Sequence, residues 1–284
     1  TGMGGSGLAG DLLQGLAPAI NLKIPIIAWK NYGLPLTNFK KPLFIFVSFS
    51  GNTEETISGL KKLLTSRKKN VALVTTNGLL KKLGEKNALP LITFPAQGLT
   101  ARESLGYTYY SVLKLLKFIL PSIKIRDLNN LNPEKLKTQG KKLARIIKGK
   151  IPLIYTDPDN THLGYIWKTN LNETAKQLAF TNTIPEMAHN EITGFEDKSS
   201  KNFIALFLKD SEADQKIIKK AEAVQKILKK HKIQNQTISL TGKNKEQKTW
   251  NAIILSHFAS LYLSKLKKID PRKTRLIDEL KKIN

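Results

Sequence analysis

The sequence predicts an α/β protein of two domains, each a parallel β-sheet flanked by helices. Short apolar runs rich in β-branched residues alternate with longer amphipathic stretches, and short connections join them. The alternation occurs twice, on either side of a polar, turn-rich stretch at residues 121–132. A chain of 284 residues is long enough for two medium domains. We expect these domains at residues 1–132 and 133–284.

The first half alternates strands and helices along its whole length. Strands are predicted at residues 24–29, 43–47, 71–75 and 91–94, and helices at residues 8–16, 54–67, 79–86 and 104–120. Parallel strands joined by helices align their carboxyl ends at one edge of a sheet, and open α/β sheets bind their ligands there. The turns that follow these strands are therefore the first places to look for a site.

The turn at residues 48–53, Ser-Phe-Ser-Gly-Asn-Thr, is the strongest single signal of the first half. It breaks a buried strand, and the Glu54-Glu55 pair that follows is typical of the first turn of a helix. A helix N-terminus offers backbone N–H groups and the positive end of a dipole, and Ser48, Ser50 and Thr53 add hydroxyl groups. Together they predict a phosphate seat that needs no metal.

Two other loops of the first half carry candidate residues. Residues 2–7, Gly-Met-Gly-Gly-Ser-Gly, form a glycine-rich turn that lets a ligand approach the backbone. Such turns also serve as tight strand-to-helix connections and normally follow a strand, so we expect a further strand ahead of Thr1. The loop at residues 95–103 ends in Arg102, which we expect at the same sheet edge as Ser48 and Ser50.

The second half repeats the architecture without close sequence repetition. Strands are predicted at residues 151–155, 203–208 and 236–240, with a short strand and a loop within residues 181–195; helices are predicted at residues 133–148, 163–178, 212–231, 249–267 and 276–282. Its titratable candidates outside surface runs are Glu173, His189, Glu191 and Lys281. By residue type alone, a mid-helix carboxylate is more often solvated, and a single histidine is more often structural.

Composition excludes several classes of site. Cysteine is absent, which excludes disulfides, thiolate catalysis and cysteine metal sites, and the four histidines argue against a histidine-rich metal site. No apolar run approaches the roughly 18–20 residues that cross a bilayer, and no secretory signal is present, so we expect a cytoplasmic protein without a membrane partner. The net charge of +25 suggests nucleic acid, but the lysines are spread over helical faces and no nucleic-acid motif is present. A solvated basic surface, attractive to an anionic substrate, is the preferred interpretation.

Four stretches carry a family resemblance over essentially the whole chain. Residues 2–7, 48–56 and 167–176 resemble the double sugar isomerase (SIS) domain proteins. Residues 185–192, Pro-Glu-Met-Ala-His-Asn-Glu-Ile, are similar to the bifunctional phosphoglucose/phosphomannose isomerases of archaea and some bacteria. The serine-rich turn indicates only the broad superfamily, whereas Glu173 and His189 in their motifs are the specific part. The resemblance implies two SIS-type α/β domains, the first binding phosphate and the second carrying the catalytic glutamate and histidine.

The resemblance also implies a role for each candidate residue. It makes Glu173 the catalytic base, Arg102 the cation beside the reacting carbons, His189 the ring-opening group supplied by the partner subunit of a homodimer, and Lys281 a lysine near the ring oxygen. It places Gly5 and Ser6 in the glycine loop that lies along the sugar. It assigns the phosphate-binding hydroxyls to Ser48, Ser50 and Thr53. It matches Thr274 to a threonine that is associated with acceptance of the mannose epimer.

These residue types suit the isomerisation of an aldose phosphate to a ketose phosphate. One carboxylate, Glu173, can move a proton between C2 and C1. A fixed cation, Arg102, can stabilise the cis-enediolate intermediate, and His189 with Lys281 can move the proton that opens the ring. The bound phosphate positions the sugar without reacting. Neither a metal nor an organic cofactor is expected.

Two other functions stay open at this point. Sugar isomerase domains also occur as non-catalytic sensors that bind a sugar phosphate and regulate transcription, although no DNA-binding domain is visible here. The second alternative is an isomerase that acts on a different phosphosugar, such as an amino sugar or a heptose. We expect glucose 6-phosphate, mannose 6-phosphate and fructose 6-phosphate as substrates and no nucleic acid as a partner.

Overall fold

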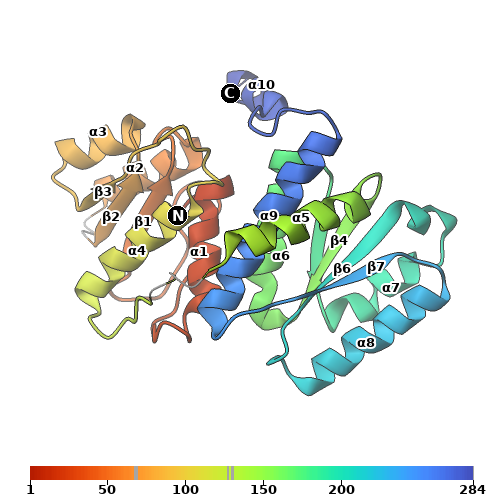
Figure 1. Ribbon diagram of the computed structural model, residues 1–284. Helices are drawn as coiled ribbons and strands as arrows, with labels where there is room; N and C mark the ends of the chain where they lie inside the picture. The colour runs from red at the N-terminus through yellow and green to blue at the C-terminus, as the bar shows by residue number, and fades with distance from the viewer. Residues whose placement is uncertain (67–69, 127, 129–130, 284) are drawn as a thin grey trace. The chain divides into compact units, whose positions relative to one another are not determined.

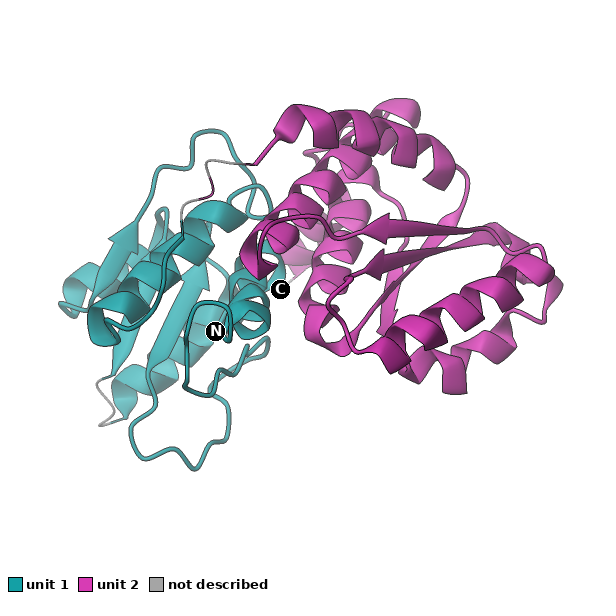
Figure 2. Ribbon diagram, turned by 60° about the horizontal axis from the view of Figure 1, so that its bottom comes forward, with its two compact units in different colours: residues 1–126 teal, residues 127–284 magenta. Residues whose placement is uncertain are grey.

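A computed structural model describes residues 1–66, 70–126, 128 and 131–283. The chain divides into two compact units, residues 1–126 and residues 127–284, coloured separately in Figure 2. Both units are parallel sheets with helices, which confirms the predicted fold class. We describe each unit by itself. Among the described helices, none is both long enough and apolar enough to cross a membrane.

Unit 1 contains a three-stranded parallel sheet in the order β1-β2-β3 (Figure 1). Its elements are α1 (Gly4–Leu16), β1 (Phe44–Ser48), α2 (Glu54–Thr65), β2 (Val71–Thr75), α3 (Gly78–Lys86), β3 (Leu91–Thr93) and α4 (Leu105–Ile119). Phe44 lies opposite Val71, and Leu73 lies opposite Leu91. Because helices cover both faces, every residue of β2 is buried, which explains its continuous apolar run.

The prediction of a strand at residues 24–29 is wrong. These residues run without regular secondary structure, although their backbone is held at two points. Gly2 N donates a hydrogen bond to Trp29 O, and Gln14 Nε2 donates one to Ile26 O. An apolar segment becomes a strand only when another strand supplies a ladder of hydrogen bonds. Here a groove lies between this segment and β1, so that ladder is missing along most of its length.

Unit 2 contains a four-stranded parallel sheet in the order β5-β4-β6-β7. Its strands are β4 (Ile151–Thr156), β5 (Phe180–Thr183), β6 (Phe203–Lys209) and β7 (Asn235–Ser239); its α-helices are α5 (Pro133–Ile147), α6 (Thr161–Ala175), α7 (Glu191–Gly194), α8 (Gln215–Lys230), α9 (Lys245–Leu266) and α10 (Arg275–Ile283). The described residues of unit 2 also form the short 3-10 helices η1 (Pro158–Asn160), η2 (Glu186–His189) and η3 (Lys198–Asn202).

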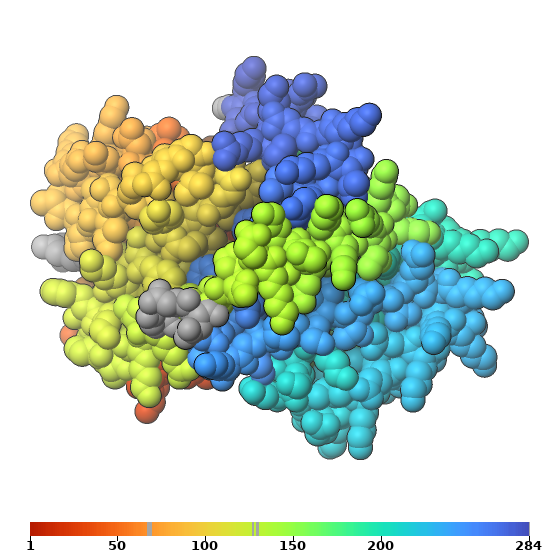
Figure 3. Space-filling view, in the orientation of Figure 1, coloured from red at the N-terminus to blue at the C-terminus, as the bar shows by residue number. Residues whose placement is uncertain are grey.

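The two faces of the second sheet are covered by different helices. α6 packs on β4 and against α9, and α5 lies over α9 on the face seen in Figure 3. On the other face, Tyr155 and Phe207 pack against Met187 of η2 and against Val224 and Leu228 of α8. The core therefore ties η2, which carries His189, to the central strands.

Several helix boundaries differ from the sequence prediction, among them the start of α1, which begins at Gly4 and not at Leu8, and two have a clear local cause. α6 ends at Ala175, three residues early, because Lys176 takes a left-handed backbone conformation (φ 47°). α9 begins at Lys245, four residues early, because the Asn244 side chain accepts a hydrogen bond from Gln247 N and caps the helix. α10 was predicted as amphipathic, and no residue of its apolar side is buried in the structure.

Candidate active site

The turn after β1 is built around the hydroxyl of Ser48. Ser48 ends β1 and is fully buried; its Oγ accepts a hydrogen bond from Gly51 N at 3.0 Å and lies 2.8 Å from Thr53 Oγ1. Ser50, by contrast, is exposed and accepts from Asn52 N at 3.2 Å. Thr53 immediately precedes α2, whose first turn leaves N–H groups without partners inside the helix. Hydroxyls and helix amides therefore meet at one point, as an anion site requires.

The glycine turn and the arginine loop reach the same point of unit 1. Ser6 Oγ accepts a hydrogen bond from Phe49 N at 2.9 Å, which joins the first turn of α1 to the turn after β1. A Cβ atom on Gly5 would lie 2.5 Å from Arg102 N, so only glycine permits this approach of the two backbones. Arg102 is 2 % exposed. Gly5, Ser6, Ser48, Thr53 and the Arg102 backbone thus form one continuous cluster.

Residues at the start of α3 support this cluster, and the sequence analysis did not identify them. Asn52 Oδ1 accepts a hydrogen bond from Leu79 N at 2.9 Å, and Gly51 O accepts one from Leu80 N at 2.8 Å. Thr76 Oγ1 donates to Phe49 O at 2.7 Å. The Asn77-Gly78 turn was the available signal, because the ends of neighbouring parallel strands lie side by side.

An aromatic row links the turn after β1 to the loop that carries Arg102. The rings of Phe49 and Phe94 are 6.2 Å apart, and Phe94 stacks on Tyr107 at 5.5 Å. Tyr107 Oη donates a hydrogen bond to Gln97 Oε1 at 3.1 Å. These contacts hold the two predicted substrate-binding segments in a fixed relation within unit 1.

In unit 2, Glu173 lies in the last turn of α6 and is half-buried. Lys176 Nζ donates hydrogen bonds to Glu173 O at 2.7 Å and to Pro271 O at 3.3 Å. Asn172 Oδ1 accepts from Ala179 N at 3.0 Å and closes the turn after the helix. The backbone at Glu173 is thereby joined to the loop that leads into α10.

His189 ends η2 on a well-anchored segment, yet its own side chain is exposed. Its neighbour Met187 is completely buried. Glu191 accepts hydrogen bonds from Tyr155 Oη at 3.0 Å and from Asn182 Nδ2 at 2.6 Å. Burial, then the charge and hydrogen bond of Glu191, raise the pKa of Tyr155. The segment around His189 is held by the apolar contacts of Met187 and the hydrogen bonds of Glu191, and the imidazole itself faces solvent.

The remaining predicted residues lie at the C-terminal end of unit 2. Thr274 O accepts a hydrogen bond from Asp278 N at 3.0 Å at the start of α10, and Lys281 is exposed on that helix. Glu173, His189 and Lys281 therefore lie on α6, η2 and α10. Their convergence on a sugar held at Ser48 stays a prediction.

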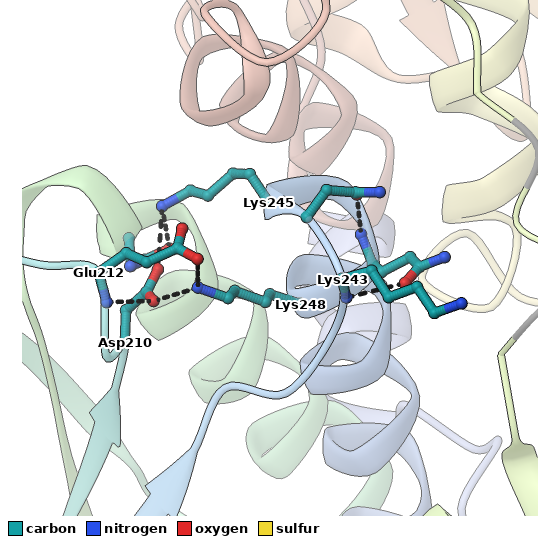
Figure 4. A network of polar contacts seen from close by, with 8 residues as sticks. Asp210, Glu212, Lys243, Lys245 and Lys248 are labelled. Atoms are coloured by element: carbon teal, nitrogen blue, oxygen red, sulfur yellow. Dashed lines mark hydrogen bonds and ion pairs between the residues drawn. The ribbon is translucent and has the colours of Figure 1, made fainter.

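A buried ionic network at the carboxyl edge of the second sheet is a further polar feature (Figure 4). Lys248 Nζ donates to Asp210 Oδ1 at 2.7 Å and lies 3.0 Å from Glu212 Oε1, and Lys245 Nζ donates to Asn160 Oδ1 at 2.7 Å. Burial raises the pKa of Asp210, but hydrogen bonds from Lys248 and Glu212 N and the charges of both lysines outweigh it and hold that pKa below its usual value. The network joins β6 to α9.

No three histidine, aspartate or glutamate side chains among the described residues lie close enough together to hold a metal ion. Of the residues predicted from the sequence, unit 1 contributes hydroxyls, backbone amides and one arginine, and unit 2 contributes one glutamate with an exposed histidine and an exposed lysine.

Comparisons with known proteins show which family this chain resembles. Residues 136–283 match the family described as bacterial phospho-glucose isomerase C-terminal SIS domain. The chain is 30 % identical to the bifunctional phosphoglucose/phosphomannose isomerase of Aquifex aeolicus, over 99 % of this chain and 88 % of that protein. It is 33 % identical to the protein of that name from Caldicellulosiruptor bescii, over 99 % of this chain and 87 % of that protein.

Solved structures support the fold alone. Glucosamine-6-phosphate deaminase from Thermotoga maritima superposes with a TM-score of 0.66 over 96 % of this chain and 86 % of its own, at 13 % identity. The sequence relatives carry the assignment further, because their similarity extends over both units. The chain therefore belongs to the bifunctional phosphoglucose/phosphomannose isomerase family.

Proposed function

We propose that this protein interconverts glucose 6-phosphate and mannose 6-phosphate with fructose 6-phosphate, through ring opening and a cis-enediolate. The observation that carries the proposal is the cluster in unit 1, where Ser48, Thr53 and the α2 N-terminus adjoin Ser6 and the Arg102 backbone. Membership of an isomerase family supplies the reaction type. The phosphate binds at the turn after β1, and the sugar extends along the glycine turn at Gly5 and Ser6.

Each step of the reaction has one residue suited to it. Glu173 removes the C2 proton of the open-chain aldose and returns it at C1, which one carboxylate can do if both carbons lie within hydrogen-bonding reach. Arg102 stabilises the negative charge that develops on the enediolate oxygens. His189 and Lys281 transfer the proton that opens the ring, and Thr274 accommodates the mannose epimer. Ser50 adds a hydroxyl to the phosphate seat.

The exposed position of His189 supports a role in a neighbouring subunit. A homodimer in which each histidine completes the partner's site gives both chains identical, two-fold related sites. The contacts of Met187 and Glu191 restrict the position of the backbone that presents the imidazole.

A coupled assay with fructose 6-phosphate tests the reaction. Glucose 6-phosphate and mannose 6-phosphate are read separately, in buffer that contains EDTA. We expect both products at rates unaffected by the chelator. If neither product forms, the reaction is refuted, and binding of fructose 6-phosphate without turnover then supports the sensor function. Turnover of glucosamine 6-phosphate alone indicates an amino-sugar enzyme.

Subunit mixing tests the shared site. Glu173→Gln and His189→Ala are each expected to be inactive as homodimers. A mixed dimer has one site that combines intact Glu173 with intact His189 of the partner subunit, so mixing equal amounts restores roughly a quarter of wild-type activity if subunits exchange at random. If each chain supplied its own histidine, every site would lack one residue and no activity would return.

A further inference from the structure

Lys176, which follows α6 directly, stands in a backbone conformation that lysine rarely adopts. Its φ is 47°, in the left-handed region. Glycine takes this conformation without steric cost and is the usual residue at a helix end of this kind, whereas a lysine there is strained. Strained positions gather at functional sites, where the surrounding contacts support them. The contacts of the Lys176 side chain are of this supporting kind.

The ammonium group of Lys176 joins two separate segments of unit 2. It donates hydrogen bonds to Glu173 O at 2.7 Å and to Pro271 O at 3.3 Å. It also lies near the carboxylate of Asp270. A backbone hydrogen bond from Arg272 is the largest cause that holds the pKa of Asp270 below its usual value, and the charge of Lys176 contributes to the same shift. One cation therefore links the end of α6 to the turn that follows α9.

A second lysine, at the end of α9, also binds the end of α6. Lys267 Nζ donates to Lys176 O at 2.9 Å and to Gln177 Oε1 at 3.2 Å. Cations near the C-terminus of a helix bind its last carbonyl groups and suit the negative end of its dipole. The end of α6, the end of α9 and the turn after α9 thus meet at Lys176, and a shift of α6 along its axis would break these bonds.

The turn that Lys176 holds leads into two of the predicted site residues, Thr274 and Lys281. Thr274 O accepts a hydrogen bond from Asp278 N at 3.0 Å, which starts α10. No residue of α10 is buried, so the helix has little packing of its own to fix its position in unit 2. Its position depends on the turn that precedes it, and that turn is bound by Lys176.

We propose that Lys176 is a positioning residue of the isomerase site, which holds the predicted base Glu173 at a set distance from Thr274 and α10. The inference rests on the proposed function. Lys176 acts through the backbones of Glu173 and Pro271, and the sugar is not its partner. Proton transfer between C2 and C1 is sensitive to this distance, because a misplacement of about 1 Å costs about 100-fold in rate. The phosphate seat after β1 belongs to unit 1 and does not use this link.

Replacing Lys176 by glycine tests the proposal, because the change removes the link and relieves the backbone strain together. We expect kcat with fructose 6-phosphate to fall at least about tenfold in Lys176→Gly, with KM within about twofold of the wild type. The melting temperature should stay close to that of the wild type, since glycine suits this backbone conformation. Lys176→Arg keeps a cation that can donate to both carbonyl groups, and its kcat should lie within about threefold of the wild type.

Lys232→Gly is the matched control. It makes the same change just after α8, where φ is 60° and the lysine is exposed, and its kcat should equal that of the wild type. Hydrogen exchange supplies a readout that does not depend on activity. The amide of Asp278 should exchange at least about tenfold faster in Lys176→Gly than in Lys232→Gly, because the turn before α10 has lost its link.

Three results would overturn the proposal: a wild-type kcat in Lys176→Gly, an equal loss of kcat in Lys232→Gly, or unchanged exchange at Asp278 in Lys176→Gly. The last would mean that the turn is held without this lysine. If the wild-type protein itself does not turn over fructose 6-phosphate, the proposed function fails. The exchange measurement still decides, in that case, whether Lys176 holds the turn before α10.

Discussion

Substitution of Gly5 by alanine should displace the loop that carries Arg102. The added Cβ would lie 2.5 Å from Arg102 N and 2.7 Å from the carbonyl carbon of Ala101, both backbone atoms. Contacts below 3.0 Å are essentially never seen, and ordinary contact begins at 3.4 Å. The Arg102 backbone must therefore move by about 0.5 to 0.9 Å.

The size of this shift sets the expected loss of activity. A misplacement of about 1 Å in a catalytic group costs about 100-fold in rate, so Gly5→Ala should lower kcat about 10- to 100-fold. Helix propensity acts in the opposite direction, since alanine is favoured over glycine by up to about 1 kcal/mol in a helix. If kcat falls and the melting temperature of Gly5→Ala does not rise, the steric contact with the Arg102 loop has outweighed the gain in helix propensity.

The assay is the fructose 6-phosphate reaction, with thermal unfolding measured on the same samples. Gly106→Ala is the matched control, because Gly106 lies on α4 of the same unit and an added Cβ there meets nothing within 4 Å. Its kcat should be unchanged. Wild-type kcat in folded Gly5→Ala protein would refute the argument that this glycine positions Arg102.

Three further predictions concern the phosphate seat and unit 2. Ser48→Ala removes the acceptor of Gly51 N and a phosphate hydroxyl, so KM for fructose 6-phosphate should rise about tenfold or more with kcat nearly unchanged. Lys248→Met leaves the buried Asp210 carboxylate without its closest cation, and the free energy of unfolding in urea should fall by about 3 kcal/mol. Burial, then the charge of Lys245, lowers the pKa of His162 to about 3. The unfolded chain therefore takes up a proton below pH 6.5 that the folded chain does not, so stability falls as pH drops from 6.5 toward 3, and His162→Phe should flatten this fall.

Each of these has a control and a contrary outcome. Thr65→Ala, at the other end of α2, should leave KM unchanged, and an unchanged KM in Ser48→Ala would remove that hydroxyl from the phosphate seat. Replacing Asp210 by leucine in the Lys248→Met background should restore part of the lost stability; full stability in Lys248→Met alone would mean that the ion pair contributes nothing. An unaltered pH dependence in His162→Phe would show that another group titrates in this range.

The part of the fold that local signals determine was predictable. β2 was predicted with the bounds it has, because a short apolar run between polar turns has few alternatives. The turn after β1 and the start of α2 were also predictable, since Ser-Gly-Asn-Thr and the following glutamates act within one turn. The prediction of a strand at residues 24–29 failed because an apolar composition does not by itself provide a neighbouring strand to pair with.

The contacts that organise the site could not be predicted in the same way. Gly5 and Arg102 are far apart in the sequence, and neither residue type indicates that their backbones touch. The early start of α9 follows from the cap at Asn244, and Lys248 in the first turns of that helix is buried where it pairs with Asp210. Lysine-rich stretches are usually exposed to solvent, so the sequence analysis did not identify the network of Lys248, Asp210 and Glu212. Ser48 was predicted from the turn that follows its strand, whereas the roles of Ser6 and Glu173 were assigned from motif resemblance, which carries information that spacing lacks.

The most direct test of the account is the turnover of fructose 6-phosphate by Glu173→Gln. The change removes the base and keeps the size of the side chain. We predict that kcat falls at least about 100-fold while the melting temperature and the affinity for fructose 6-phosphate stay close to those of the wild type. A folded Glu173→Gln protein that interconverts the sugars at a near wild-type rate would contradict the proposed mechanism.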